Sequence, residues 1–284
     1  MKKILTIMMG LLVVLSCDQK SKSSSIDDDE DEVEELKLKT YTFSGKDGMA
    51  HVDISVEYPV KGEDELVDAI RQHIAQHVVL ESDEVELSDG QGVIDYYGNN
   101  LMTEMRSLAA EYEDDDYVDE VYHNWSFSKI YETDEYVTFV GETDLYEGGV
   151  HGIEYQAGVT FFQNGQVFDY SMLRNTDSEA FQKLMRDGLC IYFKSDGEAI
   201  SEEQLAEELI NVEDVYNIPM PSAEPYITED GVKFIYQPYE ISYYGAGKPE
   251  FSIKLEKMKP YLTRKAQELL EGDEEDDEDE EDDD

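Results

Sequence analysis

The acidic runs at its two ends limit how much of this 284-residue chain can form a packed core. Residues 27–35 contain eight acids, and every residue of 273–284 is Asp or Glu. Segments of high net charge with few apolar residues do not bury enough surface to fold. The folded part is therefore expected within residues 36–270. The chain's hydrophobic content of 40%, with 20 tyrosines, is sufficient for a sizeable core there.

The acidity extends into that folded part. Residues 36–272 carry 18 Lys and Arg against 48 Asp and Glu, a net charge of −30, and the whole chain carries −47. A field of this sign repels nucleic acid and anionic lipid headgroups, and it attracts basic proteins. We therefore expect no nucleic-acid partner. The acidic tail lacks the spaced Asp-x-Asp-x-Asp-Gly pattern of a calcium loop, and we expect no metal site and no cofactor.

Residues 1–17 have the pattern of an export signal peptide. Lys2 and Lys3 precede an apolar run over residues 4–15, which is short for a membrane-spanning helix. The run ends in Val-Leu-Ser-Cys, which resembles the lipobox of bacterial lipoproteins. This resemblance implies acylation of Cys17, with palmitate among the acyl chains. We therefore expect a lipoprotein of the bacterial cell envelope that reaches the membrane through its lipid anchor.

Residues 18–35 are expected to form an acidic, flexible linker, because they contain Ser, Lys and acids with almost no apolar residues. Acid-rich stretches soon after a lipidated cysteine resemble those of Bacteroidetes-type surface lipoproteins. That resemblance implies the outer membrane as the location of the anchor.

The apolar residues of 36–270 change between the period of a strand and the period of a helix. Alternation typical of strands covers residues 36–44, 49–60, 121–145, 231–240 and 251–255, and helical periodicity covers residues 63–80, 95–112, 178–192, 202–210 and 257–270. This order predicts an α+β fold of antiparallel sheets with helices packed on one face. We expect two sequential sub-domains, residues 36–147 and 148–270, followed by a disordered acidic tail over residues 271–284.

Two segments carry the most specific motifs. Residues 148–152 are Gly-Gly-Val-His-Gly, and the strand-like sequence after them contains Phe161 and the hairpin signal Asn164-Gly165. Residues 236–247 are Tyr-Gln-Pro-Tyr-Glu-Ile-Ser-Tyr-Tyr-Gly-Ala-Gly. These motifs resemble an extracytoplasmic domain family that includes the outer part of the lysozyme-sensing anti-sigma factor RsiV and the N-terminal region of PdaC-type peptidoglycan deacetylases. The likeness spans residues 36–262 and is stronger in the second half.

The departures from that family are as informative as the likeness. An anti-sigma factor needs a transmembrane helix and a cytoplasmic segment, and the deacetylase needs a catalytic domain with an Asp-Asp pair and a His-x-x-x-His metal motif. We recognise neither in this sequence. The resemblance therefore implies the binding module alone, whose role in one branch of the family is to bind lysozyme.

The family motifs point to His151, Tyr239, Glu240, Tyr243 and Tyr244 as ligand-binding residues, and we assign no catalytic residue. Two partners are left open by the sequence. One is a cationic protein such as lysozyme, which suits the negative charge. The other is a peptidoglycan-related glycan, whose sugar rings would stack on exposed tyrosines.

An enzyme is the alternative hypothesis. In that case His151 would form an acid/base pair with a nearby carboxylate, Glu147 or Glu154, and would modify peptidoglycan. A histidine within a glycine turn more often binds loop backbone, and this favours a non-enzymatic protein. A purely structural role in the envelope is the third hypothesis.

His73 and His77 stand four residues apart on a predicted helix, a spacing that metal sites use. No Glu lies between them and no third ligand is evident. Both border the apolar stripe of the helix, so we interpret them as partly buried structural histidines.

Overall fold

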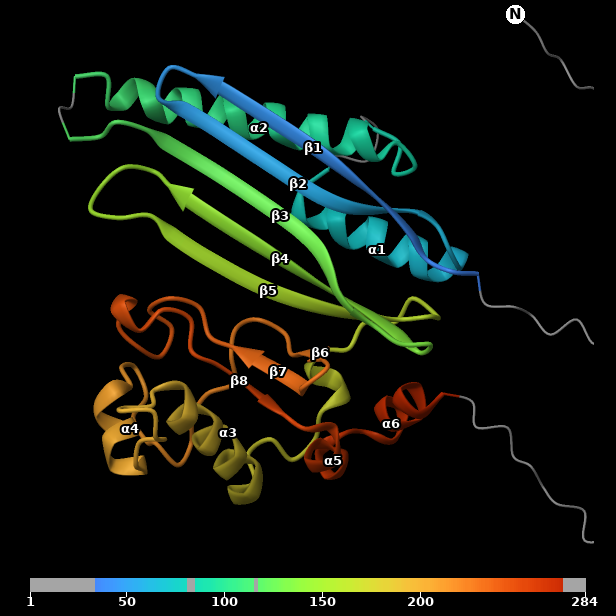
Figure 1. The fold of residues 1–284 in the computed structure, drawn as a ribbon, viewed down its shortest axis with the longest axis vertical. Helices are drawn as coiled ribbons and strands as arrows, with labels where there is room; N and C mark the ends of the chain where they lie inside the picture. Colours follow the sequence, from blue (N-terminus) through green and yellow to red (C-terminus); the bar gives the residue numbers. More distant parts are fainter. Residues whose placement is uncertain (1–33, 81–84, 115–116, 273–284) are drawn as a thin grey trace, which may run out of the picture. The chain divides into compact units, whose positions relative to one another are not determined.

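Five strands in chain order form the larger of two sheets (Figure 1). They are β1 (Lys37–Asp47), β2 (Ala50–Lys61), β3 (Val121–Glu132), β4 (Tyr136–Tyr146) and β5 (Ile153–Phe162). Successive side chains alternate between the two faces, as β2 illustrates: Val52, Ile54 and Val56 are buried, whereas Asp53 and Ser55 are exposed. One face of this sheet is therefore apolar and the other is polar.

The computed structural model describes residues 34–80, 85–114 and 117–272, which belong to one unit of the chain. The predicted signal peptide with Cys17, residues 18–33 of the linker and residues 273–284 of the tail lie outside the described residues. Within the described part, no helix combines the length and the apolar character that a membrane span requires.

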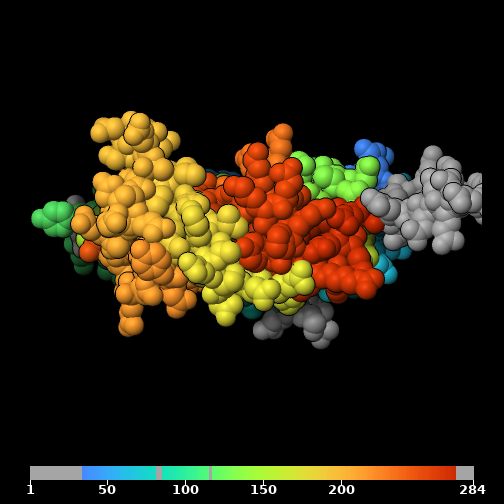
Figure 2. All heavy atoms as spheres, turned by 90° about the horizontal axis from the view of Figure 1, so that it is seen from below, coloured from blue at the N-terminus to red at the C-terminus, as the bar shows by residue number. Residues whose placement is uncertain are grey.

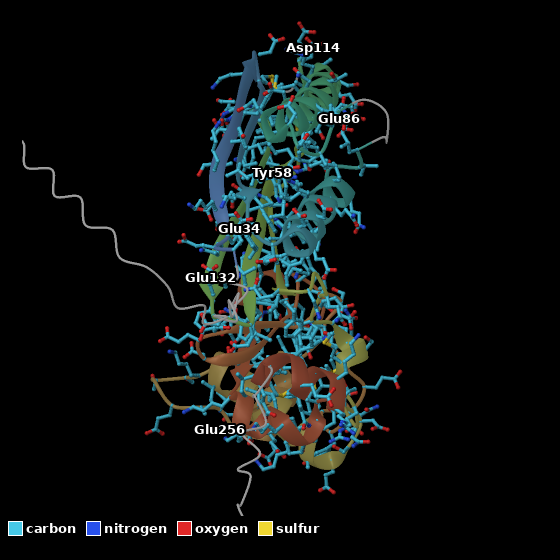
Figure 3. The ribbon with its side chains drawn as sticks, turned by 90° about the vertical axis from the view of Figure 1, so that its right-hand side faces the viewer. Glu34, Tyr58, Glu86, Asp114, Glu132 and Glu256 are labelled. Atoms are coloured by element: carbon cyan, nitrogen blue, oxygen red, sulfur yellow. The ribbon has the colours of Figure 1, made fainter. Side chains whose placement is uncertain are left out.

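Two helices, α1 (Asp64–His77) and α2 (Gly90–Glu111), cover the apolar face of the larger sheet (Figure 3). The predicted stripe of α1 is buried there through Leu66, Ile70 and Ile74. Tyr58 lies between sheet and helices, and its hydroxyl donates a hydrogen bond to the Leu87 carbonyl at 2.6 Å. The prediction of helices packed on one face of a sheet is confirmed.

One strand pair departs from the predicted antiparallel pattern. β2 and β3 run parallel, from Ala50 beside Val121 to Val56 beside Phe127, whereas the other pairs in both sheets are antiparallel. After β2 the chain passes through α1 and α2. It then begins β3 at the same end of the sheet at which β2 begins. Parallel neighbouring strands need such a crossover connection, whereas antiparallel neighbours can be joined by a tight hairpin.

The C-terminal region is a second, smaller α+β layer. Its antiparallel sheet contains β6 (Tyr226–Thr228), β7 (Gly231–Ile235) and β8 (Glu250–Ile253). Its helices are α3 (Glu179–Tyr192), α4 (Glu202–Glu208), α5 (Leu255–Met258) and α6 (Arg264–Glu271), with short 3₁₀ turns η1 (Tyr170–Met172), η2 (Tyr244–Ala246) and η3 (Lys259–Tyr261). Figure 2 shows the surface formed by α3 and α4 (yellow to orange) and by the last helices (red). The predicted α+β class, in two successive regions, is confirmed.

Strand β5 joins the two regions. The ring of Tyr226 packs directly against Gly158, and a methyl group on that glycine would lie 2.2 Å from the ring. The Thr160 hydroxyl accepts a hydrogen bond from the Ile227 backbone at 2.8 Å and lies 2.7 Å from the Thr138 hydroxyl. Both threonines are fully buried, so their hydroxyl groups are satisfied by each other and by the backbone of β6.

Several predicted boundaries are wrong for identifiable reasons. The helix expected over residues 257–270 is divided into α5, η3 and α6, because Pro260 cannot donate a backbone hydrogen bond and Thr263 caps a new helix. The strand expected over residues 231–240 ends at Ile235, before Pro238 and before Tyr239, whose φ is +67°. The hairpin signal Asn164-Gly165 predicted a second strand after the turn. The chain makes only a single β-bridge there, between Val167 and Phe161. The short strand β6 was not predicted.

The contact between Gly158 and Tyr226 gives the first testable prediction. We expect Gly158→Ala to lower the free energy of unfolding by about 1–3 kcal/mol, because the added methyl group forces the Tyr226 ring out of place. Gly141→Ala on the neighbouring strand is the matched control, since its methyl group would meet Phe127 and Trp125 at an ordinary 3.6 Å. Urea denaturation measures both variants. Equal free energies of unfolding for the two variants would contradict the tight packing of Tyr226 against Gly158.

Candidate ligand-binding site

Three of the predicted residues form one aromatic cluster. The ring of His151 stacks on Tyr244 with centroids 3.8 Å apart, and Tyr244 stacks on Tyr239 at 5.6 Å. His151 lies in the turn between β4 and β5, and the tyrosines belong to the segment between β7 and β8. The two motifs, distant in sequence, therefore meet at one place. We call His151, Tyr239 and Tyr244 the aromatic stack.

The glycines of residues 148–152 allow the turn to present His151 in this way. Gly148 and Gly149 have φ angles of +88° and +105°, which residues other than glycine rarely adopt. A methyl group on Gly148 would also lie 2.4 Å from the ring of Tyr112. The conformation of this turn therefore depends on glycine for both backbone freedom and space.

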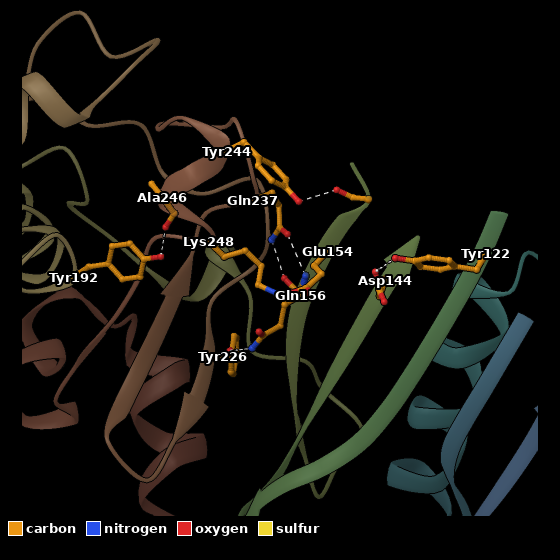
Figure 4. A network of polar contacts seen from close by, with 11 residues as sticks. Tyr122, Asp144, Glu154, Gln156, Tyr192, Tyr226, Gln237, Tyr244, Ala246 and Lys248 are labelled. Atoms are coloured by element: carbon orange, nitrogen blue, oxygen red, sulfur yellow. Dashed lines mark hydrogen bonds and ion pairs between the residues drawn. The ribbon is translucent and has the colours of Figure 1, made fainter. Parts of the chain in front are cut away.

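The hydrogen bonds of His151 determine its tautomer. Its Nδ1 lies 2.8 Å from the Gly152 carbonyl oxygen. The same oxygen accepts a hydrogen bond from the hydroxyl of Tyr244, which Figure 4 labels, at 2.8 Å. A carbonyl oxygen only accepts, so Nδ1 carries the hydrogen. In neutral imidazole Nε2 is then the acceptor, and it receives the Tyr239 hydroxyl at 3.2 Å. Both ring nitrogens thus hold the stack together.

Glu240 and Tyr243, the other two predicted residues, have different surroundings. The Glu240 carboxylate accepts the backbone N–H groups of Ser222 at 2.6 Å and Gln237 at 2.7 Å, so it fixes the loop that carries Tyr239. Such charge-assisted bonds make it a positioning residue. Tyr243 is 64% exposed beside the stack, and Val150 in the facing turn is 97% exposed. The exposed ring of Tyr243 is the one best placed for contact with a ligand.

A groove lined by acids lies beside the aromatic stack and was not predicted. It has a volume of about 620 Å³ and follows the polar face of the larger sheet. Its acidic residues are Asp53, Glu142, Asp144 and Glu154. Among the described residues that line it, Lys248 is the one basic residue, and it pairs with Glu154 at 3.2 Å (Figure 4). We call this surface the acidic groove.

The acidic groove and the aromatic stack are contiguous. Tyr122 donates a hydrogen bond to Asp144 in the groove at 3.3 Å. The same tyrosine lines a shallow hollow of about 340 Å³ with His151, Asp119 and Glu120. Desolvation, with added repulsion from Asp144, raises the pKa of Tyr122, so its hydroxyl stays protonated as a donor. The alternation of acids on outward positions of three strands was the sequence signal for this groove.

The paired histidines stack on aromatic side chains of β3. His77 stacks on Trp125 with centroids 4.2 Å apart, and His73 stacks on Phe127 at 5.8 Å. Burial lowers the pKa of His73. It lowers the pKa of His77 to about 4, with a further contribution from nearby His73 and His123. His77 keeps one exposed edge, but its ring face is covered by Trp125. Among the described residues, no group of three metal-ligating side chains occurs.

The fold and this site define an α+β protein with an aromatic cluster at its β4–β5 turn. Residues 163–256 match the model of a family described as a protein of unknown function, DUF3298. The matched segment starts at the Asn164-Gly165 hairpin and includes Tyr239 and Tyr244, while His151 lies outside it. A comparison with curated proteins found no match.

Two solved structures have a similar fold. A member of the DUF3298 family from Bacteroides fragilis superimposes with a TM-score of 0.62 at 19% identity, covering 84% of this chain and 98% of that chain. A DUF3298 family protein from Pseudomonas aeruginosa gives a TM-score of 0.50 at 13% identity, covering 81% of this chain and 94% of that chain. At these identities the likeness establishes the fold.

The lowered pKa values of the two partly buried histidines predict acid lability. Because the pKa of His77 is lowered from 6.5 to about 4, the folded state binds fewer protons than the unfolded chain between these values. The contribution of the neutral His77 ring to the free energy of unfolding is therefore complete above pH 6.5, and it is lost as the pH falls toward 4. We expect the melting temperature to fall across that window, and His77→Gln to make the fall shallower. Thermal scans at a series of pH values measure this, and an equally steep fall in the variant would argue against it.

Proposed function

We propose that this chain is a lipid-anchored protein of the bacterial cell envelope that captures a cationic protein, with lysozyme as the first candidate. The observation that carries the proposal is the acidic groove that continues into the aromatic stack. The anchor would be Cys17, and the outer membrane is the proposed location. Palmitoylation at that cysteine is part of the proposal, and mass spectrometry of the mature protein tests it.

Charge supports a basic partner. The acidic groove presents Asp53, Glu142 and Asp144 on one sheet face, and Lys248 is already paired with Glu154. A concave surface of one sign focuses the field and increases the rate of encounter with a partner of opposite sign. The surrounding negative charge of the chain adds to that field and is screened by salt.

Aromatic side chains supply the contact energy that charge alone does not. Tyrosine is enriched among residues that dominate binding energy, because it offers a large rigid surface at a small entropic cost. Tyr243 is exposed, and the neighbouring stack is fixed by hydrogen bonds before any ligand arrives. Such preorganisation reduces the cost of binding.

The family resemblance supports the same partner. The motifs that contain His151 and Tyr239 resemble the RsiV/PdaC-like domains, one branch of which binds lysozyme. A peptidoglycan-related glycan remains the other ligand that this resemblance suggests.

The geometry favours binding over peptidoglycan modification by His151. Among the described residues neither ring nitrogen is paired with a carboxylate, since they face Gly152 and Tyr239. Glu154 pairs with Lys248 instead. A general base needs its proton-accepting nitrogen directed at a substrate, and here Nε2 is directed at a tyrosine.

Neutralising the groove tests the electrostatic part of the proposal. We expect Asp53→Asn combined with Glu142→Gln to slow association with lysozyme by about tenfold at low salt, because the local field is weakened. Glu229→Gln combined with Asp230→Asn is the control, since it removes the same charge from the exposed β6–β7 turn. Stopped-flow or biosensor kinetics across a salt series measures both. If the full chain does not bind lysozyme even at low salt, the proposed capture of lysozyme is wrong.

Truncating the exposed tyrosine tests the aromatic part. We expect Tyr243→Ala to increase the dissociation rate of lysozyme by about tenfold, corresponding to the loss of one anchoring side chain. Ile191→Ala on α3 is the control, because Ile191 is 63% exposed and is not a member of the aromatic stack. Unfolding curves of both variants should match the wild type. Identical dissociation rates would remove Tyr243 from the site.

A further inference from the structure

A second hollow lies on the helix-covered face of the larger sheet and has a chemistry unlike the acidic groove. It has a volume of about 290 Å³ and lies beside β5, where α1 and the loop after residue 220 border the strand. Trp125, Phe127, His73, His77 and Tyr155 supply its ring-bearing walls. Trp125 is the sole tryptophan of the chain. We call this hollow the tryptophan pocket.

Small residues of the larger sheet leave room for the tryptophan pocket. Gly141 and Ala157 face each other on β4 and β5, and both line the pocket. A methyl group on Gly141 would lie 3.6 Å from both Trp125 and Phe127, so glycine keeps the floor free beside the two rings. Small residues at two paired positions, surrounded by aromatic walls, create a concave site rather than a filled core.

The pocket is electrically neutral in a strongly acidic protein. No carboxylate is among its described lining residues. The acidic groove and three shallower hollows, in contrast, include side chains such as Asp53, Glu63, Glu120 and Glu229. Burial lowers the pKa of both His73 and His77, so their rings are uncharged at neutral pH. An ionised ligand would find no opposite charge inside.

The rim supplies hydrogen-bonding groups. The side-chain amide of Gln237 borders the pocket while it bonds the backbone of Gln156 at 2.8 and 3.1 Å, which fixes its orientation. The hydroxyl groups of Ser222 and Thr143 belong to the same lining. Aromatic walls with a few fixed polar groups are the usual composition of a small-molecule site.

We propose that the tryptophan pocket binds one neutral pyranose ring of a sugar ligand, with an apolar ring face against the exposed ring of Tyr155 and hydroxyl or amide groups toward Gln237 and Ser222. A pyranose presents C–H groups on one face and polar groups around its edge, which matches aromatic walls and a polar rim. The volume of about 290 Å³ is just below the range of about 300–1,000 Å³ typical of ligand sites, which suits a single ring. The linings of this pocket and of the acidic groove share Trp125, Thr143 and Tyr155, but the inference does not depend on protein capture in the groove.

Titration of the full chain with N-acetylglucosamine tests the inference, with Trp125 fluorescence as the readout. We expect a saturable change with a dissociation constant on the order of 1 mM. Glucosamine and glucuronic acid, which place a positive or a negative charge on a similar ring, are expected to bind at least tenfold more weakly. All titrations are made in about 1 M NaCl, where a Debye length of about 3 Å screens the field of the whole chain.

Ala157→Leu fills the pocket and completes the test. Ala157 is exposed, so the larger side chain extends into the hollow without replacing a buried neighbour, and we expect at least tenfold weaker sugar binding. Ala110→Leu is the matched control, because Ala110 is exposed on α2 and does not line the pocket. It should bind as the wild type does.

Several outcomes would overturn the inference. No saturable response to N-acetylglucosamine up to about 50 mM, a concentration well above the expected dissociation constant, would exclude a sugar site. Charged sugars binding as tightly as the neutral one would contradict the neutral chemistry. An equal response to cyclohexanol, which lacks the ring of hydroxyl groups, would show that the polar rim does not distinguish a sugar from an apolar ring. Unchanged binding by Ala157→Leu would place the ligand elsewhere.

Discussion

The rest of the structure depends on how strand β5 is covered by the C-terminal region. The Tyr226 ring lies on Gly158, the Ile227 backbone donates to Thr160, and the Gln237 amide bonds the backbone of Gln156. β5 is the last strand of its sheet, and an uncovered edge exposes unpaired N–H and C=O groups. Here a side-chain amide replaces part of a neighbouring strand. The edge is protected, and the loop that carries Tyr239 is fixed at the same time.

This arrangement places two chemically opposite surfaces on the same pair of strands. Glu142, Asp144 and Glu154 project from β4 and β5 into the acidic groove, whereas Gly141 and Ala157 line the neutral tryptophan pocket. The strand period of two makes this separation possible, since neighbouring residues point to opposite faces. A large net charge can thus coexist with a hollow that has no carboxylate among its described lining residues.

The sequence was sufficient for the elements whose signals are local. The first hairpin, the stripe of α1 and the cap of α3 at Ser178 follow from alternation, helical period and capping. The family motifs pointed to His151, Tyr239 and Tyr244 as ligand-binding residues, but whether they converge was left open. Their convergence could not be derived from spacing, because the two segments meet only through the packing of β5 against the second region.

Other features depend on tertiary contacts that leave little trace in sequence. Glu240 was predicted as a ligand-binding residue, but its carboxylate accepts hydrogen bonds from two backbone N–H groups. The acidic groove needed the register of β2 to β5, which brings Asp53, Glu142 and Glu154 to one face. Strand β6 is too short for a periodic signal and is stabilised by its contact with β5. The break at Pro260 was readable and was missed.

The parallel pairing of β2 with β3 has a consequence for how the chain folds. The hairpin β1–β2 and the antiparallel set β3–β4–β5 consist of local contacts, which form quickly. Ala50 and Val121 pair only after the intervening helices have closed a long loop. We therefore expect two early-forming pieces whose docking is the slow step. Before docking, the inner edges of β2 and β3 are both unpaired, and the unfinished molecule is most prone to join a second copy at that stage.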